Sequence, residues 1–332
     1  MKMVKQKQQI PQQTGFKFSL AKVILNIILV FILISLVGVY LSYYMGILGE
    51  PEKFEVVAEP LKLETGNLSY EVEQFYPNMK FNHNTISYKI DPACSEKKKE
   101  RMLEAFSELE DSIGIINFYP SVEADIEVSC SESSKKSPEK DFFIAGEGGA
   151  KEIIQTGKYN VVTNGVILLH GLSERAQECE WPNVELHELL HVFGFDHSKD
   201  ENSLMYPYLE SCGQKLDEAI INDLKKLYSM ENLADLYFKE VSAEKRGRYL
   251  DFNISIKNSG VIDAENVVLS VFDEGKEVDD FDLDDISFGA GVNFQVKGLK
   301  ISRSSESIEL VIDTSDFIKE LDENNNVVRL GF

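Results

Sequence analysis

The sequence predicts a chain of three parts: an N-terminal helix, a domain of mixed helices and strands, and an all-β sandwich. Three observations support this fold class. Residues 23–48 carry no charge, residues 85–228 alternate between strand and helix patterns, and the residues after Asp235 show strand patterns alone. The 332 residues are enough for about two ordinary domains besides the helix.

The uncharged run Val23–Leu48 is longer than the roughly 20 apolar residues that cross a bilayer. It also exceeds the apolar core of about 7–15 residues in a secretory signal, so a cleaved signal is the weaker alternative. Five lysines and no acidic residue lie in residues 1–49. By the positive-inside rule we expect a cytoplasmic tail at 1–22, a single-pass membrane anchor at 23–48 and an extracellular remainder.

The formal net charge is −22, and the part of the chain after the lysine-rich N-terminus is more acidic still. An acidic surface repels phosphate backbones, which argues against a nucleic-acid partner. Residues 49–79 contain three prolines and no sustained period, so they are interpreted as a stalk or a propeptide.

The mixed domain is expected at residues 80–232, where hydrophobic spacing follows either a strand or a helix period. The expected strands are Thr85–Ile90, Ile115–Tyr119, Asp125–Cys130 and Tyr159–Leu169, the last with a turn at Asn164-Gly165. The expected helices are Lys97–Ile113, Val184–Phe193 and Leu216–Tyr228.

The C-terminal sandwich is expected at residues 233–332, because short alternating strands follow one another with turn signals between them. The clearest strands are Leu250–Ile256, Val267–Phe272, Phe294–Val296 and Ile308–Ile312. Turns are expected at Asn258-Ser259-Gly260 and Asp273-Glu274-Gly275.

The four cysteines are an even number in a segment expected to be extracellular, where disulfides persist. Of the three pairings, Cys94–Cys130 with Cys179–Cys212 is favoured, because each bond then closes a compact loop within one domain. Four buried thiols are the alternative.

Residues 187–197 read HELLHVFGFDH and predict a catalytic metal site. His187 and His191 are one helical turn apart, so both imidazoles project from the same face. Gly194 allows a positive φ, and the chain can therefore turn and bring His197 to the same metal. Three histidines leave a fourth zinc position open for water, and Glu188 is placed to take the proton of that water. An amphipathic helix with solvent-facing histidines is the structural alternative.

The longer segment HELLHVFGFDHSKDENSLMYP resembles the active-site region of the metzincin metalloproteases, and among them the matrixins. The resemblance implies a zincin fold with a mixed twisted sheet and an active-site helix, one catalytic Zn²⁺ and protein or peptide substrates. Met205 matches the methionine turn that supports the metal site. Pro207 and Tyr208 resemble the wall of the pocket beyond the scissile bond, with simple packing as the alternative for Tyr208.

Two departures from the matrixins limit what the resemblance implies. Residues 141–170 contain only one histidine, so no second zinc is expected, and residues 49–79 contain no cysteine for zymogen latency. The stretch Ala145–Ala150 is weakly similar to the glycine-rich turn that precedes the substrate-binding edge strand of the family.

The C-terminal region resembles the CARDB family of immunoglobulin-like modules at Asn258-Ser259-Gly260, Ala264–Val268 and Glu320–Asn326. This resemblance implies adhesion or spacing at a prokaryotic cell surface. The acidic cluster Asp273–Asp285 is interpreted as a solvated face, with calcium binding as the alternative.

The resulting hypothesis is a membrane-anchored extracellular zinc endopeptidase that uses Glu188 as general base. A cell-surface adhesion protein with a vestigial zinc domain is the alternative. The sequence leaves the substrate, the cleavage preference and the oligomeric state open.

Overall fold

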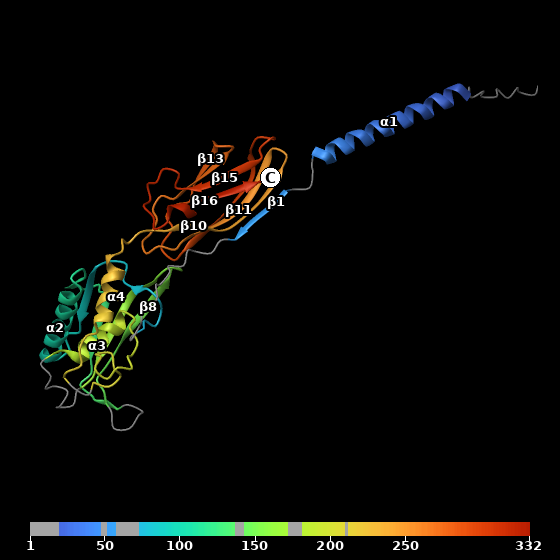
Figure 1. Ribbon diagram of the computed structural model, residues 1–332. Helices are drawn as coiled ribbons and strands as arrows, with labels where there is room; N and C mark the ends of the chain where they lie inside the picture. Colours follow the sequence, from blue (N-terminus) through green and yellow to red (C-terminus); the bar gives the residue numbers. More distant parts are fainter. Residues whose placement is uncertain (1–19, 48–51, 58–72, 137–142, 172–180, 210–211) are drawn as a thin grey trace, which may run out of the picture. The chain divides into compact units, whose positions relative to one another are not determined.

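The computed structural model describes residues 20–47, 52–57, 73–136, 143–171, 181–209 and 212–332. The chain divides into two compact units, Met1–Pro51 and Glu52–Phe332 (Figure 1). The second unit contains a mixed domain, defined here as residues 73–230, and a sandwich that includes residues 234–332.

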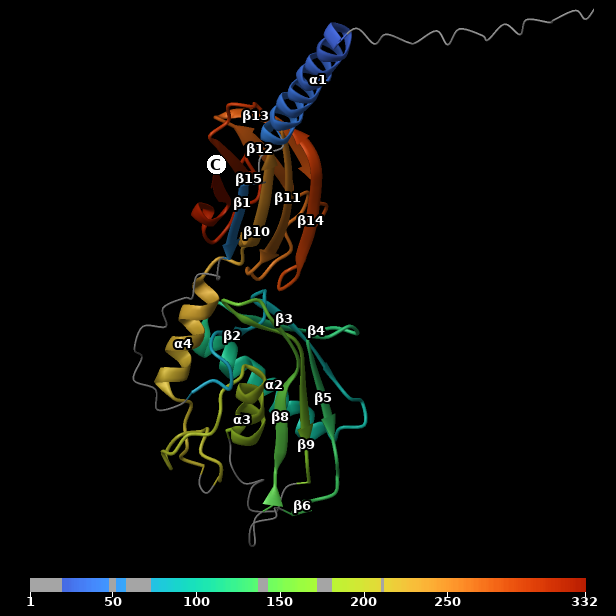
Figure 2. The same ribbon diagram turned by 90° about the vertical axis from the view of Figure 1, so that its right-hand side faces the viewer.

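The mixed domain is built on a six-stranded sheet (Figure 2). Its strands are β2 (Met79–Lys80), β3 (Thr85–Ile90), β4 (Asn117–Pro120), β5 (Ile126–Cys130), β8 (Gly146–Gln155) and β9 (Asn160–Leu169). The order β2-β9-β5-β3-β4 is parallel throughout, whereas β8 runs antiparallel to β9. Among the described strands β8 pairs with β9 alone, so it forms an edge of the sheet. Two short strands, β6 (Lys135–Lys136) and β7 (Phe143–Ile144), pair separately.

Three helices accompany this sheet: α2 (Glu96–Ile113), α3 (Asn183–Val192) and α4 (Glu218–Ser229). All three were predicted from helical spacing to within three residues at each end. The helix α2 ends at Gly114, whose φ of 75° is the left-handed conformation that favours glycine at a C-cap. The apolar face of α2 and the apolar residues of α3 enter one hydrophobic core with the sheet.

The turn predicted at Asn164-Gly165 is wrong, because β9 continues through both residues. Gly165 is present for another reason: a Cβ at this position would overlap the Val192 side chain of α3. A glycine inside a strand can mark such a close approach as well as a turn. The stretch that resembled a turn, Ala145–Ala150, likewise lies mostly within the strand β8.

The sandwich consists of two four-stranded antiparallel sheets. One has the order β1-β10-β11-β14, from β1 (Glu52–Val57), β10 (Leu236–Arg246), β11 (Tyr249–Asn258) and β14 (Gly291–Lys300). The other has the order β13-β12-β15-β16, from β13 (Lys276–Asp282), β12 (Val268–Asp273), β15 (Ser307–Ile312) and β16 (Val327–Gly331). The alternate residues Leu250, Phe252, Ile254 and Ile256 of β11 are buried in the core between the sheets.

The strand β1 comes from the segment that the sequence suggested to be a stalk or propeptide. It pairs with β10 over six residues, with Glu52 opposite Lys245 and Lys53 opposite Glu244, and so forms the edge of this sheet. A short N-terminal strand therefore completes one sheet of a C-terminal sandwich. The sequence contained no alternation at residues 52–57 from which this could be predicted.

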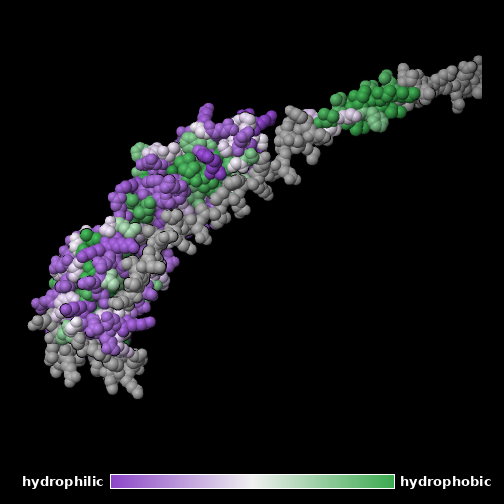
Figure 3. Space-filling model, in the orientation of Figure 1, coloured by the Kyte–Doolittle hydropathy of each residue, from purple (hydrophilic) through white to green (hydrophobic). Residues whose placement is uncertain are grey.

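The first unit contains the helix α1, which spans Leu20–Ile47 as predicted for this segment. The part of α1 with described side chains is coloured hydrophobic in Figure 3, whereas hydrophilic residues cover much of the visible face of the second unit. No helix within the described residues is long and apolar enough to cross a membrane, so the predicted transmembrane anchor is not supported.

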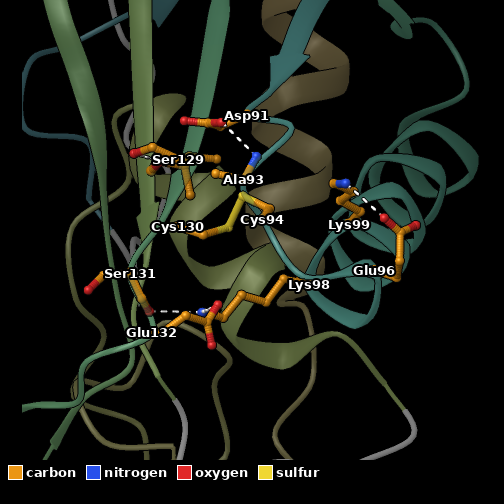
Figure 4. Close-up of a disulfide and its surroundings, with 11 residues drawn as sticks. Asp91, Ala93, Cys94, Glu96, Lys98, Lys99, Ser129, Cys130, Ser131 and Glu132 are labelled. Carbon is orange, nitrogen blue, oxygen red and sulfur yellow. Dashed lines mark hydrogen bonds and ion pairs between the residues drawn. A yellow bond between two sulfur atoms is a disulfide. The ribbon is translucent and has the colours of Figure 1, made fainter.

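A disulfide joins Cys94, just before α2, to Cys130 at the end of β5 (Figure 4). The predicted pairing of these two cysteines is confirmed. Hydrogen bonds of Lys98 to the Ser131 carbonyl and to the Glu132 carboxylate lie beside it. The second predicted bond involves Cys179, which lies outside the described residues.

Candidate metal centre

The helix α3 carries three of the predicted site residues, His187, Glu188 and His191, and all three are buried. Its orientation is fixed near its N-terminus by an ion pair between Arg101 of α2 and Glu185, both of which are also buried. Arg101 donates a further hydrogen bond to the Trp181 carbonyl. Because a charge in this position is stable only when paired, the ion pair fixes how α3 packs on α2.

The three histidines converge with their Nε2 atoms facing one another. The Nε2 atom of His191 lies 3.1 Å from that of His187 and 3.2 Å from that of His197. Four-coordinate zinc with Zn–N distances of about 2.0–2.1 Å requires ligand separations of about 3.3 Å at the tetrahedral angle. The spacing therefore fits a zinc ion.

Hydrogen bonds on the far side of two rings set the ligand tautomer. The Nδ1 atom of His187 lies 2.7 Å from the Leu204 carbonyl oxygen, and that of His191 lies 2.7 Å from the Phe195 carbonyl oxygen. A carbonyl accepts only, so each Nδ1 carries the proton and each Nε2 presents its lone pair to the centre. Lone pairs that face one another repel unless a cation lies between them, which again fits a metal.

The turn that brings His197 to the other two histidines depends on Gly194, whose φ is 88°. A Cβ on Gly194 would also overlap the Met79 side chain. The upstream residue Gln74 holds this turn through side-chain bonds of 3.0 Å each to the Met79 amide and the Phe193 carbonyl. Gln74 was not among the predicted site residues, because nothing in the local sequence pattern marks it.

Met205 is fully buried in the hydrophobic core that also contains the apolar residues of α3. Its carbonyl accepts a hydrogen bond of 2.8 Å from the Ser198 amide, and its amide donates to the Ser203 hydroxyl at 3.0 Å. The Ser203 hydroxyl in turn donates to Asp217 at 2.6 Å. Met205 is thus tied through its backbone to Ser198, the residue that follows His197.

Glu188 is covered by the edge strand β8. The Gly148 amide is hydrogen-bonded to the Glu188 carboxylate. A Cβ at Gly148 would overlap the Glu188 carbonyl oxygen, and one at Gly146 would lie 2.5 Å from the Glu188 Cγ. Both glycines therefore allow β8 to approach α3 closely, which the sequence pattern did not reveal.

The buried environment of the site favours the neutral forms of the three histidines and of Glu188. Burial lowers the pKa of His187 to about 3 and lowers the pKa values of His191 and His197 below their usual range. Burial also raises the pKa of Glu188 to about 8, with added repulsion from Glu147 and Glu185. A cation bound to the histidines would favour the ionised carboxylate and lower this pKa.

We expect the metal to be retained at pH 6 and released only at lower pH, because the lowered pKa values keep the three imidazoles neutral below pH 6.5. Below pH 6.5 these histidines bind protons in the unfolded chain but not in the folded, metal-free protein. The free energy of unfolding of the metal-free protein therefore falls as the pH falls. Zinc content after dialysis between pH 4 and pH 7 tests this. Half-release already at pH 6.5, with the fold intact by circular dichroism, would contradict it.

The remaining predicted residues lie outside this cluster. Pro207 is exposed and Tyr208 is half-buried, with its ring 5.8 Å from that of Tyr206, in a T-shaped arrangement. Within the described part of the chain, one cluster of ligand atoms lies close enough together to hold a metal ion, and it consists of the three histidines. Among the described residues, the acidic side chains of residues 273–285 form no cluster that could hold a metal ion. Many of these residues lie along the exposed strand β13.

Comparisons with known proteins match two regions of the chain. Residues 79–229 match the family model for Matrixin, and residues 233–329 match that for CARDB. A comparison with curated proteins gives no match.

Similar solved structures include two of a CARDB domain and one of a cell-surface-protein domain, each at 17% identity over 30% of this chain with a TM-score of 0.26. One is a crystal structure from Pyrococcus furiosus in complex with di-metal ions, of which 85% is covered. The solution structure of the same domain is covered to 93%. The third is a domain of a putative cell surface protein from Methanosarcina acetivorans, covered to 91%.

Proposed function

We propose, for a chain that combines a matrixin-type region at residues 79–229 with a CARDB domain at residues 233–329, that the mixed domain is a zinc-dependent endopeptidase. One observation carries the proposal. Three histidine Nε2 atoms converge at 3.1 and 3.2 Å, and the buried carboxylate of Glu188 follows directly after the first of these ligands. A purely structural metal site has no use for that carboxylate.

His187, His191 and His197 would hold the zinc ion, which would polarise the scissile carbonyl and lower the pKa of the attacking water. Glu188 takes the proton from that water and passes it to the leaving amine. The Gly148 amide orients the Glu188 carboxylate. Burial by β8 excludes bulk water from Glu188, which strengthens each electrostatic contact there.

The substrate in this proposal is an extended peptide. The strand β8 is an edge of the sheet and pairs on one side with β9, so its other side can add a peptide strand through main-chain hydrogen bonds. The substrate residue after the scissile bond would then lie toward the segment that contains Pro207 and Tyr208.

We further propose that this domain works outside the cytoplasm. The support is the disulfide between Cys94 and Cys130, since cytosolic reductants keep most thiols reduced. The acidic composition agrees with a protein or peptide substrate rather than a nucleic acid.

Removal of zinc from the full chain is expected to reduce cleavage of a mixed peptide library to background, and one equivalent of zinc per chain to restore it. The measurement pairs mass-spectrometric mapping of cut sites with a metal assay. A chain that binds one zinc tightly and cleaves nothing would contradict the proposal. That result would favour the alternative of a surface adhesion protein in which the zinc site is vestigial.

A further inference from the structure

The turn between β8 and β9 carries a buried ion pair that joins the mixed domain to the sandwich. The Lys158 Nζ atom lies 2.8 Å from the Asp235 Oδ2 atom, and the two side chains are 3% and 0% exposed. Asp235 also accepts hydrogen bonds from the Ser259 hydroxyl and from the Asn325 amide. Both charges are thus compensated at a place that water does not reach.

Neutral contacts extend the same junction on both sides of the ion pair. The Thr156 hydroxyl donates to the Ser259 carbonyl at 2.8 Å. Tyr159 and Val161 form a small hydrophobic cluster with Val261 of the sandwich. At Gly289 a Cβ would lie 2.6 Å from the Ile154 side chain, so the sandwich backbone comes close to β8 itself.

The strand that this junction holds is the one that covers Glu188. Gly148 and Gly146 lie in the first part of β8, against α3, and Ile154 lies near its C-terminal end. The edge strand is therefore fixed at two places, by α3 near its start and by the sandwich near its end. Between them lies the backbone along which an extended peptide would pair.

We infer that the sandwich acts as a positioning domain for the substrate-binding edge strand, and that the Lys158–Asp235 ion pair is the contact through which it acts. The inference rests on the proposed function. It gives the C-terminal domain a role in substrate binding rather than in adhesion or spacing alone. Lys158 and Asp235 are positioning residues, since neither lies at the metal centre.

The test uses full-length protein and the variants Lys158→Met, Asp235→Leu and the double variant. Removing one partner leaves an uncompensated buried charge, whereas replacing both by apolar residues is close to neutral. We expect each single variant to speed hydrogen exchange of the β8 amides by about tenfold or more. We also expect it to raise KM by about tenfold with kcat changed less than about threefold, and the double variant to recover most of both effects.

A matched control is Lys319→Met, which breaks the ion pair of Lys319 with Glu231, whose side chains are 68% and 66% exposed. An exposed ion pair contributes little to stability, so hydrogen exchange of the β8 amides and KM are expected to stay at wild-type values. Zinc content is measured throughout and is expected to remain at one ion per chain.

Unchanged exchange of the β8 amides in both single variants, while residues 258–262 of the sandwich exchange faster, would overturn the inference. So would faster exchange of β8 with an unchanged KM. If no form of the protein cleaves peptides, the proposed function fails separately. The exchange data alone then decide whether the sandwich holds β8.

Discussion

Glu188→Gln is expected to lower kcat/KM for peptide cleavage by about 10²–10⁴-fold while the protein keeps one zinc ion per chain. Glutamine fills the same volume between α3 and β8 but cannot accept the proton of the attacking water. The metal stays because the ligands are the three histidine Nε2 atoms, whose geometry does not involve the Glu188 carboxylate. Peptide-cleavage kinetics and a zinc assay on the same preparation provide the measurement.

The matched control is Glu218→Gln, in the first turn of α4, where the side chain is exposed and lies outside the metal centre. Its kinetics are expected to equal those of the wild type. A Glu188→Gln protein that keeps its zinc and cleaves within about threefold of the wild-type rate would show that another group serves as the base. Loss of zinc with the activity would instead show that Glu188 supports the metal.

Gly148→Ala is expected to destabilise the domain by about 1–3 kcal/mol and to abolish most of the activity. The added Cβ would overlap the Glu188 carbonyl oxygen of α3, which is backbone and cannot rotate away. The strand β8 must then move off the helix, and the Gly148 amide no longer reaches the Glu188 carboxylate. Thermal unfolding and peptide-cleavage kinetics measure the two consequences.

The neighbouring glycine provides the control for this prediction. A Cβ at Gly149 meets no atom within 4 Å, and its φ is not in the left-handed region. Gly149→Ala is therefore expected to be neutral, or to stabilise by up to about 1 kcal/mol by restricting the unfolded chain. Equal melting temperatures and rates for the two variants would contradict the close approach of β8 to α3.

The helices of the mixed domain could be predicted well because helical periodicity is a local signal. The strand Thr85–Ile90 was also predicted to the residue, from its alternation of polar and apolar residue types in the sequence. The strand β8 was missed, since three of its first four residues are glycines and its exposed edge gives no alternation. Gly146 and Gly148 are needed there because α3 packs closely against β8, and α3 lies more than thirty residues further along the chain than these glycines.

The N-terminal strand β1 shows the same limit more strongly. Glu52–Val57 is short and acidic, and it pairs with β10 almost two hundred residues later. Strand pairing of this kind depends on which edge is available in the folded sandwich. Nothing within six residues of sequence can contain that information.

The sequence by itself determined which residues make up the candidate metal centre. One helical turn separates His187 from His191, and Gly194 allows the turn to His197, so the ligand set follows from backbone geometry over eleven residues. Only the tertiary structure decided how those ligands are oriented and covered. Long-range packing brings three contacts to the site or to its edge strand: the Leu204 carbonyl, the Gly148 amide and the ion pair of Lys158 with the sandwich. The local periodicity of the sequence contains no information on such contacts.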